Sequence, residues 1–382
     1  MHPLPPIPPI LPMSQDIYIG LMSGTSLDGV DGVMVQFAPD GATMQILATA
    51  YQPFDAGLQQ AAMQLQQPGE NEIEREAALA QRLAQVYAAC VADLCRQAPD
   101  QTVQAIGVHG QTIRHRPELG WTRQTNHPAL LAELSGLDVI ADFRSRDLAA
   151  GGQGAPLVPA FHQAIFGSSV HQRVVVNIGG ISNISILCPD GAVSGFDTGP
   201  GNVLMDGWIR QHLGHGYDAD GAWAASGQVS QALLDRLLQE PYLQLPAPKS
   251  TGRDLFHADW LRLQLREFTD LAAVDVQATL CAYTAQTIIM ASLAYSPSCD
   301  ALYVCGGGAY NHHLMQQMRH YLALYGSNAQ VHSTAALGVA PECVEALAFA
   351  WLARQFSLRL PGNLPAVTGA RGLRILGALY PA

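Results

Sequence analysis

Alternating apolar and polar segments near the start of the chain predict a strand, a tight turn and a second strand. One apolar run covers residues 17–21 and another covers 30–37, with the polar stretch Ser23–Gly29 between them. Short apolar runs bounded by serine, aspartate and glycine are typical of β-hairpins. The tetrapeptide Pro39–Ala42 predicts a second hairpin turn, and a third strand is expected over Thr43–Tyr51.

The same order of elements returns in the second half of the chain. A β-branched strand over Arg173–Asn177 breaks at Gly179–Gly180, and a second strand is expected over Ile184–Leu187. The tetrapeptide Pro189–Ala192 repeats the letters PDGA of the first half, and a third strand leads into a polar turn over Gly195–Asn202. A repeated order of elements at this scale indicates an internal duplication of a domain.

Helices and short buried strands are expected to alternate in the rest of the chain. The longest helical periodicity runs over Asn71–Gln97, where Asn71 and Glu74 resemble a capping box. The glycine-rich segment Ala149–Pro159 marks the expected change of domain. Further helices are predicted over residues 129–135, 203–213, 229–238, 275–295 and 341–355, and strands over 105–108, 139–143 and 301–304.

Composition limits the classes of partner. The 382 residues are 48% hydrophobic and carry a formal net charge of -11, which argues against nucleic acid or an anionic membrane as the main partner. No apolar run approaches the roughly 20 residues that a membrane helix needs. Lys249 is the single lysine, so the sequence contains no Walker-A loop. Phosphate binding would therefore use backbone, hydroxyl, arginine or metal.

Cysteine usage and the N-terminus favour a cytoplasmic protein. The seven cysteines form no C-x-x-C pair and several lie in apolar runs, as expected of reduced thiols. Residues 1–13 are rich in proline and lack the basic region and apolar core of a secretory signal. We interpret them as a disordered extension, with Met13 as an alternative start of translation.

The first turn carries the chemistry of an anion site. Glycine lets a ligand approach the backbone, and the hydroxyls of Ser23, Thr25 and Ser26 add donors. Asp28 and Asp31 follow at once, and either carboxylate can orient a magnesium ion, directly or through water. An ordinary hairpin turn is the alternative interpretation of this stretch taken alone.

Polar residues also follow the buried strands predicted later in the chain. His109, Gln111 and Thr112 come directly after one of them, at the position where α/β proteins place their sites. A loop histidine with no role in binding is the alternative. A triple glycine opens the segment Cys305–Asn311 after another strand, where a flat or phosphorylated group can lie against the backbone.

Taken together, the motifs resemble a known enzyme family. Two related halves that each open with strand, turn and strand describe the architecture of actin, hexokinase and Hsp70-like ATPases. Within that architecture, the individual motifs resemble those of the anhydro-N-acetylmuramic acid kinase family, from Tyr18 to about residue 376. The motifs are LMSGTSLDGVD, GVHGQTIRH, DFRSRDLAAGGQGAPLVPAFH, NIGGISNIS, GFDTGPGN, PKSTGRDLF, CGGGAYN and VEALAFAWLA. The proline-rich extension and a degenerate stretch around Tyr321–Ala335 depart from the family.

The resemblance implies an α/β fold of two duplicated actin/hexokinase-like, ribonuclease H-like domains that flank a nucleotide cleft. The domains would span residues 14–148, with or without the tail 360–382, and residues 149–359. It implies a cytoplasmic enzyme of cell-wall recycling that uses ATP, Mg²⁺ and water to convert 1,6-anhydro-N-acetylmuramic acid into N-acetylmuramic acid 6-phosphate. The partners would be ATP and the amino sugar, and a homodimer is one assembly to consider.

The resemblance also assigns residues. Asp197 would be the general base for the attacking water, and Glu345 would bind sugar hydroxyls or order that water; their alternatives are a helix-capping aspartate and a helix-surface glutamate. Asp28 would hold Mg²⁺, directly or through water. The nucleotide residues would be Gly24, Thr25, Ser26, Leu27, Asp28, Gly29, Val30, Asp31, Gly179, Gly180, Thr198, Gly199, Gly201, Asn202, Gly306, Gly307, Gly308 and Asn311. The sugar residues would be His109, Gln111, Thr112, Gln153 and one of Arg144 or Arg146.

Three other functions compete with this interpretation. One is a different sugar kinase of the same superfamily. A nucleotide-gated clamp of the Hsp70 or actin type would need a peptide-binding domain, which the sequence lacks. A phosphatase acting on phosphoanhydrides would need a basic channel, against which the acidic composition argues. ATP consumption without a sugar would favour the clamp or the phosphatase.

Overall fold

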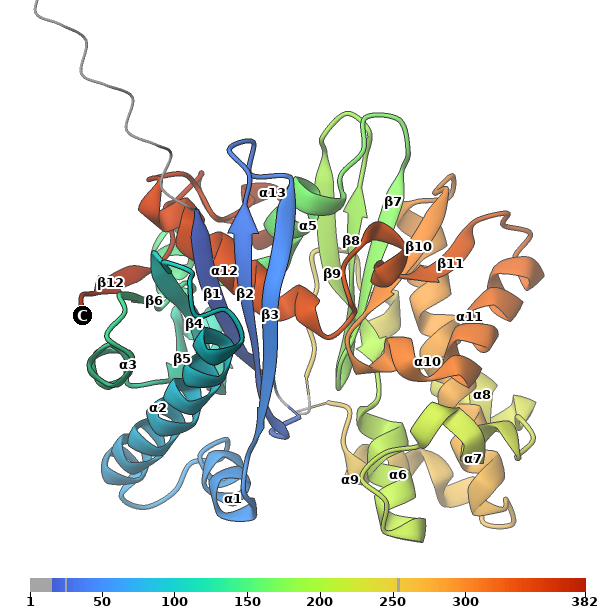
Figure 1. Cartoon of the computed structure of the whole chain (residues 1–382). Helices are drawn as coiled ribbons and strands as arrows, with labels where there is room; N and C mark the ends of the chain where they lie inside the picture. Colours follow the sequence, from blue (N-terminus) through green and yellow to red (C-terminus); the bar gives the residue numbers. More distant parts are fainter. Residues whose placement is uncertain (1–15, 25, 253–254) are drawn as a thin grey trace, which may run out of the picture.

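Two β-sheets form the frame of the molecule in a computed structural model, which describes residues 16–24, 26–252 and 255–382 (Figure 1). The first sheet contains β1 (Ile17–Ser23), β2 (Gly29–Phe37), β3 (Met44–Pro53), β4 (Ala105–Arg116), β5 (Trp121–Thr125), β6 (Val139–Ala141) and β12 (Ala378–Tyr380). The second contains β7 (Arg173–Ile178), β8 (Ile181–Leu187), β9 (Val193–Pro200), β10 (Ala301–Cys305) and β11 (Gln330–Ser333). The predicted disordered extension 1–13 lies outside the described residues.

The two sheets repeat one strand order. In the first, β3, β2 and β1 are antiparallel neighbours, and β4 and β6 continue in parallel. In the second, β9, β8 and β7 are antiparallel neighbours, and β10 and β11 continue in parallel. The prediction of two duplicated ribonuclease H-like α/β halves is confirmed by this match. The first sheet adds β5 and the C-terminal β12 at its β4 and β6 side.

Helices cover both outer faces and fill the space between the sheets (Figure 1). The first half holds α1 (Ala56–Gln64), α2 (Glu72–Gln97), α3 (Pro128–Ser135) and α4 (Ser145–Ala149). Helix α5 (Val158–Phe166) contacts β8 and β9 of the second sheet. The second half holds α6 (Val203–Leu213), α7 (Ala222–Ala225), α8 (Gln231–Leu237), α9 (Ala258–Gln264), α10 (Ala273–Tyr295), α11 (His312–Leu324), α12 (Cys343–Ser357) and α13 (Pro365–Thr368). Within the described part of the chain, none of these helices combines the length and apolar character that a membrane span requires.

The core follows the two-residue period of the strands. On β1, Ile17 and Ile19 pack with α2 on the outer face, whereas Tyr18 packs with α12 on the inner face. On β7, Val174 joins the outer core beside α10, whereas Val175 joins the inner core. One apolar layer around α12 and α5 is therefore shared by both sheets.

Helix α12 lies in the predicted second domain but packs on the strands of the first sheet. The contact is close because a Cβ added to Gly20 on β1 would overlap Ala346 O, and one added to Gly107 on β4 would overlap Phe349 O. Only glycine permits such an approach of helix and strand backbones. The predicted boundary at residues 148–149 stays a prediction.

The secondary structure predicted for two segments that carry candidate site residues is wrong. The strand predicted over 105–108 runs to Arg116, because its second part pairs with β5 as a hairpin, so residues 109–112 lie in a strand. The segment Gly195–Asn202 is not a turn: it is strand β9 as far as Pro200, since it pairs with β8. The turn that corresponds to the β1–β2 turn of the first half is the β7–β8 hairpin at Gly179 and Gly180.

The predicted capping box at Asn71 is also wrong. Asn71 is the residue before α2, but its backbone is left-handed (φ 50°) and its side chain accepts no N–H of the helix. Its amide instead donates to the Glu74 carboxylate, 2.5 Å away.

Helix α12 begins at Cys343, two residues later than the predicted start at Pro341. All seven cysteines, which the structure describes, are free as expected.

Candidate active site

The turn between β1 and β2 is held from both sides. Gln111 Nε2 on β4 donates to Gly24 O over 3.0 Å, and Ser26 Oγ donates to Asp28 Oδ1 over 2.6 Å. Leu27 is buried beneath the turn with a left-handed backbone (φ 60°), a conformation that costs energy for a branched side chain. Burying Leu27 thus fixes the direction of the neighbouring N–H groups. Thr25 lies outside the described residues.

Three glycine turns leave free space beside their backbones. A Cβ added to Gly24, Gly179 or Gly307 would meet no atom closer than 3.5, 3.7 and 3.9 Å, respectively. Gly179 follows β7 and Gly307 follows β10, and these strands are parallel neighbours, so the two turns lie at the same sheet edge. Open glycine backbone at the carboxyl ends of parallel strands is where phosphate groups bind.

Several predicted nucleotide residues instead build the turns. Gly201 N donates to Gly180 O and Asn202 N donates to Gly179 O, both over 2.9 Å. Other members are used in the same structural way. The Thr198 and Ser182 hydroxyls are hydrogen-bonded to each other, and Gly199 lies in β9. A Cβ added to Gly308 would overlap Ile178, and one added to Gly306 would overlap Asn177 Oδ1. Asn311 Oδ1 caps the N-terminus of α11. Val30 is buried in the outer core, and Gly29 pairs with Pro53.

A group of carboxylates lies where the two halves meet. Burial, together with the nearby charges of Asp28, Glu345 and Glu342, raises the pKa of Asp31 to about 7. Burial also raises the pKa of Glu345, whereas Arg144 lowers it. Asn177 Nδ2 at the end of β7 donates to Glu345 Oε1 over 3.3 Å, so this glutamate joins α12 to the second sheet.

This negative potential fits a divalent cation. In the part of the chain that the structure describes, no three His, Cys, Asp or Glu side chains are grouped to hold a metal without help. Mg²⁺ usually keeps several waters and takes one or two carboxylates plus the phosphates of its nucleotide. Asp28 is exposed at the turn between β1 and β2, and Asp31 is close enough for its pKa to be raised by the charge of Asp28. The residues present therefore fit that pattern.

His109 and Arg144 form the polar centre of the first half. Arg144 Nε and Nη2 donate to His109 Nε2 over 3.1 and 2.9 Å, and Nη1 donates to Gly154 O over 2.7 Å. Burial and the guanidinium hold the pKa of His109 well below its usual range, so the ring is neutral. Burial also lowers the pKa of Arg144 to about 10, which leaves it a cation. Gln111, beside this pair, has a buried Oε1 without a protein partner among the described residues.

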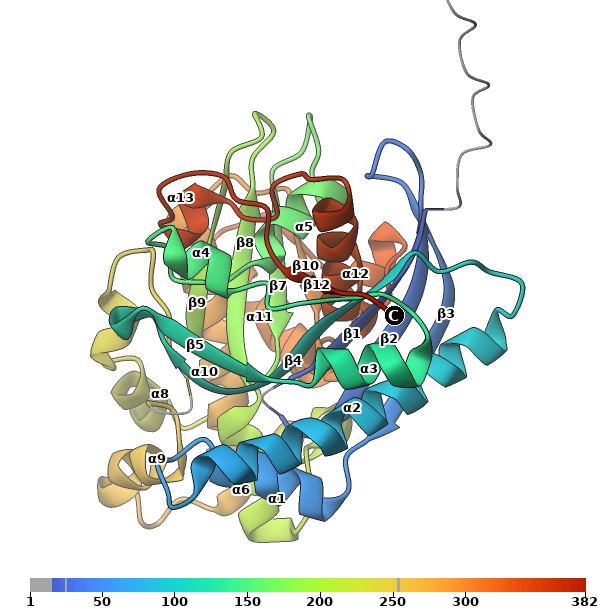
Figure 2. The ribbon, with the colours of Figure 1, turned by 90° about the vertical axis from the view of Figure 1, so that its left-hand side faces the viewer.

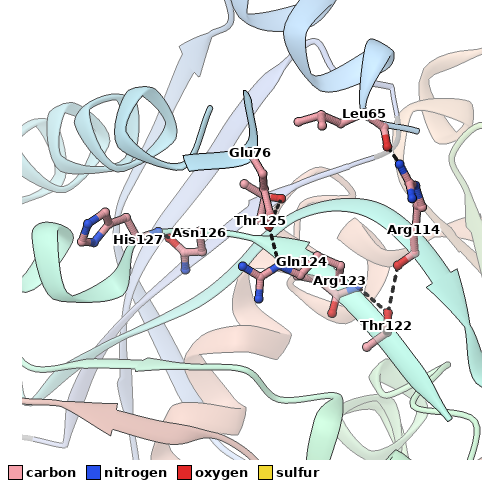
Figure 3. A network of polar contacts seen from close by, with 9 residues as sticks. All are labelled: Leu65, Glu76, Arg114, Thr122, Arg123, Gln124, Thr125, Asn126 and His127. Carbon is pink, nitrogen blue, oxygen red and sulfur yellow. Dashed lines mark hydrogen bonds and ion pairs between the residues drawn. The ribbon is translucent and has the colours of Figure 1, made fainter. Parts of the chain in front are cut away.

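The remaining predicted sugar residues lie apart from this pair. Thr112 Oγ1 accepts from Gln124 Nε2 over 3.1 Å. Gln124 also donates to Thr122 Oγ1, and both of these residues belong to the network along β5 in Figure 3. Arg146 is exposed on α4 and lines a surface hollow with Leu373 and Arg374. Gln153 is exposed, and its backbone N–H donates to Thr368 O over 2.8 Å.

Two residues that the sequence analysis did not select also lie near the site. Asn126 follows β5 beside Gly110, and its buried Nδ2 has no protein partner among the described residues (Figure 3). Thr251 N–H donates to Asp197 Oδ2 over 3.0 Å. Asn126 lies in the run QTNHP, which the sequence analysis did not select, and Thr251 lies in the motif PKSTGRDLF, which is among the motifs that carry the family resemblance. Lys249 Nζ itself donates to the carbonyls of Tyr242 and Leu243.

Asp197 is the residue of the second half that was predicted to be the general base. It lies on β9, where its backbone N–H donates to Lys249 O and its carbonyl accepts from the Tyr242 hydroxyl. The side chain is partly exposed, and burial raises its pKa to about 7 although Thr251 N–H lowers it. A carboxylate whose pKa lies near neutral pH is suited to accept a proton from water.

Comparison with known proteins agrees with the motifs. Residues 16–382 match the family model of anhydro-N-acetylmuramic acid kinase. The anhydro-N-acetylmuramic acid kinase of Paraburkholderia xenovorans LB400 is 56% identical over 376 residues, which cover 97% of this chain and 100% of that protein. The enzyme of the same name from Burkholderia orbicola MC0-3 is 57% identical over 368 residues, 96% of each chain.

A more distant likeness links the chain to a solved structure. The activator of the 2-hydroxyisocaproyl-CoA dehydratase from Clostridium difficile, with bound ADPNP, is 11% identical with a TM-score of 0.46. The alignment covers 90% of this chain and 96% of that one. The full-length match to the family model and the two close relatives show that the chain belongs to the anhydro-N-acetylmuramic acid kinase family.

Proposed function

We propose that the chain uses ATP and water to convert 1,6-anhydro-N-acetylmuramic acid into N-acetylmuramic acid 6-phosphate, in the recycling of cell-wall peptidoglycan. Family membership over residues 16–382 supports the kinase activity, and the enzyme is an ATP-dependent sugar kinase. The observation that carries the proposal for the site is Asp197, a partly exposed carboxylate with a pKa of about 7 on β9, which pairs with the strand that follows the second glycine turn.

Water is the nucleophile in the proposed reaction. Asp197 accepts a proton from water as the water oxygen bonds to the anomeric carbon, and the bond from that carbon to O6 breaks. The freed O6 takes the γ-phosphoryl group, and ADP leaves. Opening the ring and transferring phosphate in one site avoids release of the hydrolysed sugar. Such catalysis depends mainly on positioning and on neutralising charge.

The first half is proposed to hold the sugar. Arg144 remains a cation beside neutral His109 and suits the lactyl carboxylate, whereas Arg146 points elsewhere. Gln111 Oε1 and Asn126 Nδ2, which have no protein partner among the described residues, are available to the acetamido group and the hydroxyls. Glu345 is proposed to order the water or bind a hydroxyl, because it lies between Asn177 and the charge of Arg144.

The glycine turns are proposed to hold the nucleotide. Gly24, Gly179 and Gly307 leave room for phosphate and adenosine against their backbones. Asp28, with Asp31, would hold Mg²⁺, which neutralises charge on the β- and γ-phosphates when bound. The nucleotide would lie between the proposed domains 14–148 and 149–359. We also propose a cytoplasmic location, which the free cysteines favour.

Product analysis tests the activity. Purified protein is incubated with ATP and magnesium, with and without 1,6-anhydro-N-acetylmuramic acid, while ADP and the phosphorylated sugar are quantified by chromatography and mass spectrometry. We expect ADP only with the sugar, one ADP per phosphosugar, and one water added to the product. ADP release without sugar would indicate an ATPase of another function and would contradict the proposal.

A further inference from the structure

Asp147 is a fully buried carboxylate that the proposed reaction does not use. It follows Arg144 by one turn on α4 and is 0% exposed. Its Oδ1 accepts from Asn363 Nδ2 over 2.7 Å and from Thr368 Oγ1 over 2.8 Å. Its Oδ2 accepts from Gly154 N over 2.8 Å. One side chain therefore joins two segments separated by more than 200 residues.

On one side, Asp147 reaches the proposed sugar site through the glycine loop. Gly154 N–H donates to Asp147, and Gly154 O accepts from Arg144 Nη1 over 2.7 Å. Arg144 in turn donates to His109. Gly152 passes so close that an added Cβ would overlap Asp147 Oδ2. The position of Gly154 O, and with it one of the three hydrogen bonds that orient Arg144, depends on this carboxylate.

On the other side, Asp147 holds the C-terminal segment. Gln153 N donates to Thr368 O over 2.8 Å, and Arg371 N donates to Ala150 O over 2.9 Å, so this segment also borders the loop through its backbone. Helix α13, which ends at Thr368, lies beside α4 (Figure 2) and contacts β9, the strand of Asp197. The C-terminal segment thus touches both the loop that orients Arg144 and the strand that carries the proposed base.

We propose that Asp147 is a positioning residue for the sugar site, which fixes the Arg144 guanidinium by clamping the loop 151–154 against Asn363 and Thr368 of the C-terminal segment. The inference rests on the proposed role of Arg144. Asp147 touches no reacting atom in this account; it acts through Gly154. Loss of the clamp frees Arg144 to turn, which weakens binding of the anionic sugar and leaves the glycine turns of the nucleotide intact.

Asp147→Asn is the direct test, because an amide nitrogen in place of either oxygen faces an N–H or O–H donor. We expect the KM for the anhydro sugar to rise about tenfold, the scale of losing a hydrogen bond to a charged group, with the KM for ATP changed less than about twofold. Thr368→Val removes one donor to Asp147 and should raise the sugar KM by a smaller factor. Thr368→Ser keeps the hydroxyl and should have the sugar KM of the wild type.

A matched control separates positioning from stability. Asp16→Asn breaks the contact of Asp16 with the buried Arg354, far along the chain from the sugar site, and should lower Tm without changing the sugar KM. An unchanged sugar KM in both Asp147→Asn and Thr368→Val would overturn the inference. If Asp147→Asn fails to fold, the Thr368→Val and Thr368→Ser pair decides. An unchanged sugar KM in Arg144→Gln would overturn the proposed sugar site instead.

Discussion

The two sheets share a strand order, but the charged groups beside them have different partners. In the first half, Arg144 is surrounded by His109, Gly154 O and the nearby charge of Glu345. In the second half, the Asp197 carboxylate accepts one hydrogen bond from the described residues, from Thr251 N–H. A group with many fixed partners suits binding, whereas a poorly solvated carboxylate suits proton transfer. In the proposed account, two sheets of the same strand order therefore have different roles: the first half binds the sugar and the second half supplies the base.

The pH dependence of the wild-type enzyme is the largest expected effect. Asp197 acts as a base only when ionised, and its pKa is about 7, so kcat/KM for the sugar should be constant above pH 8 and fall as pH decreases. At pH 5 the loss should reach about a hundredfold, because roughly one carboxylate in a hundred remains ionised two units below its pKa. Initial rates at saturating ATP and magnesium measure this.

Asp31 provides the control for that profile, since its pKa is also about 7. Asp31→Asn should keep the inflection of kcat/KM. An inflection that disappears in Asp31→Asn, or a wild-type profile that is flat between pH 5 and 8, would assign the proton transfer elsewhere.

Replacing the cation of the first half should affect binding. Arg144→Gln is expected to raise the KM for the anhydro sugar by about tenfold or more, because a charge-assisted contact to the lactyl carboxylate is lost. The KM for ATP should stay within about twofold. Arg146→Gln, on the same helix turn but exposed beside Leu373, is the matched control and should behave as wild type. Equal effects of the two substitutions would remove the distinction between these arginines.

The packing of α12 against β1 can be tested through the free energy of unfolding. Gly20→Ala would place a methyl group against Ala346 O, so the helix that carries Glu345 must shift. We expect a loss of about 1–3 kcal/mol in the free energy of unfolding, measured by urea denaturation. Gly207→Ala in α6 is the control, because its Cβ would enter open space and alanine favours helix. A stable Gly20→Ala protein would show that α12 is not held by this contact.

A smaller effect concerns the stability of Asp197→Asn. The folded pKa of Asp197, about 7, exceeds its ordinary value of 3.8, so the unfolded chain releases this proton more easily and stability falls as pH rises through that window. Asparagine does not ionise. Its Tm should therefore exceed that of wild type by a few degrees at pH 8, and the gap should shrink towards pH 5. A lower Tm at pH 8 would contradict the raised pKa of this carboxylate.

Local signals explain what the sequence could predict. Both PDGA tetrapeptides form hairpin turns, because Asp40 and Asp190 each accept the backbone N–H two residues later. The glycine turns and the helices of the second half follow from patterns of the same kind. Such features depend on residues that are close in sequence.

Long-range contacts explain the rest. The position of α12 against the first sheet depends on Gly20 and Gly107, far from the helix in sequence, and no local pattern reveals it. The same holds for the contact of Asp147 with Asn363, and for β4, which is longer than predicted because β5 pairs with its second part. The choice between Arg144 and Arg146 likewise needed the tertiary structure.

Single-turnover ADP formation in Asp197→Asn and Glu345→Gln tests the division of labour most directly. At saturating sugar and ATP, we expect Asp197→Asn to slow the reaction by at least about a hundredfold, the scale of losing a general base, and Glu345→Gln to slow it less. Asp197→Asn at wild-type speed, with Glu345→Gln inactive, would contradict the account and move the base from the second half of the molecule to α12.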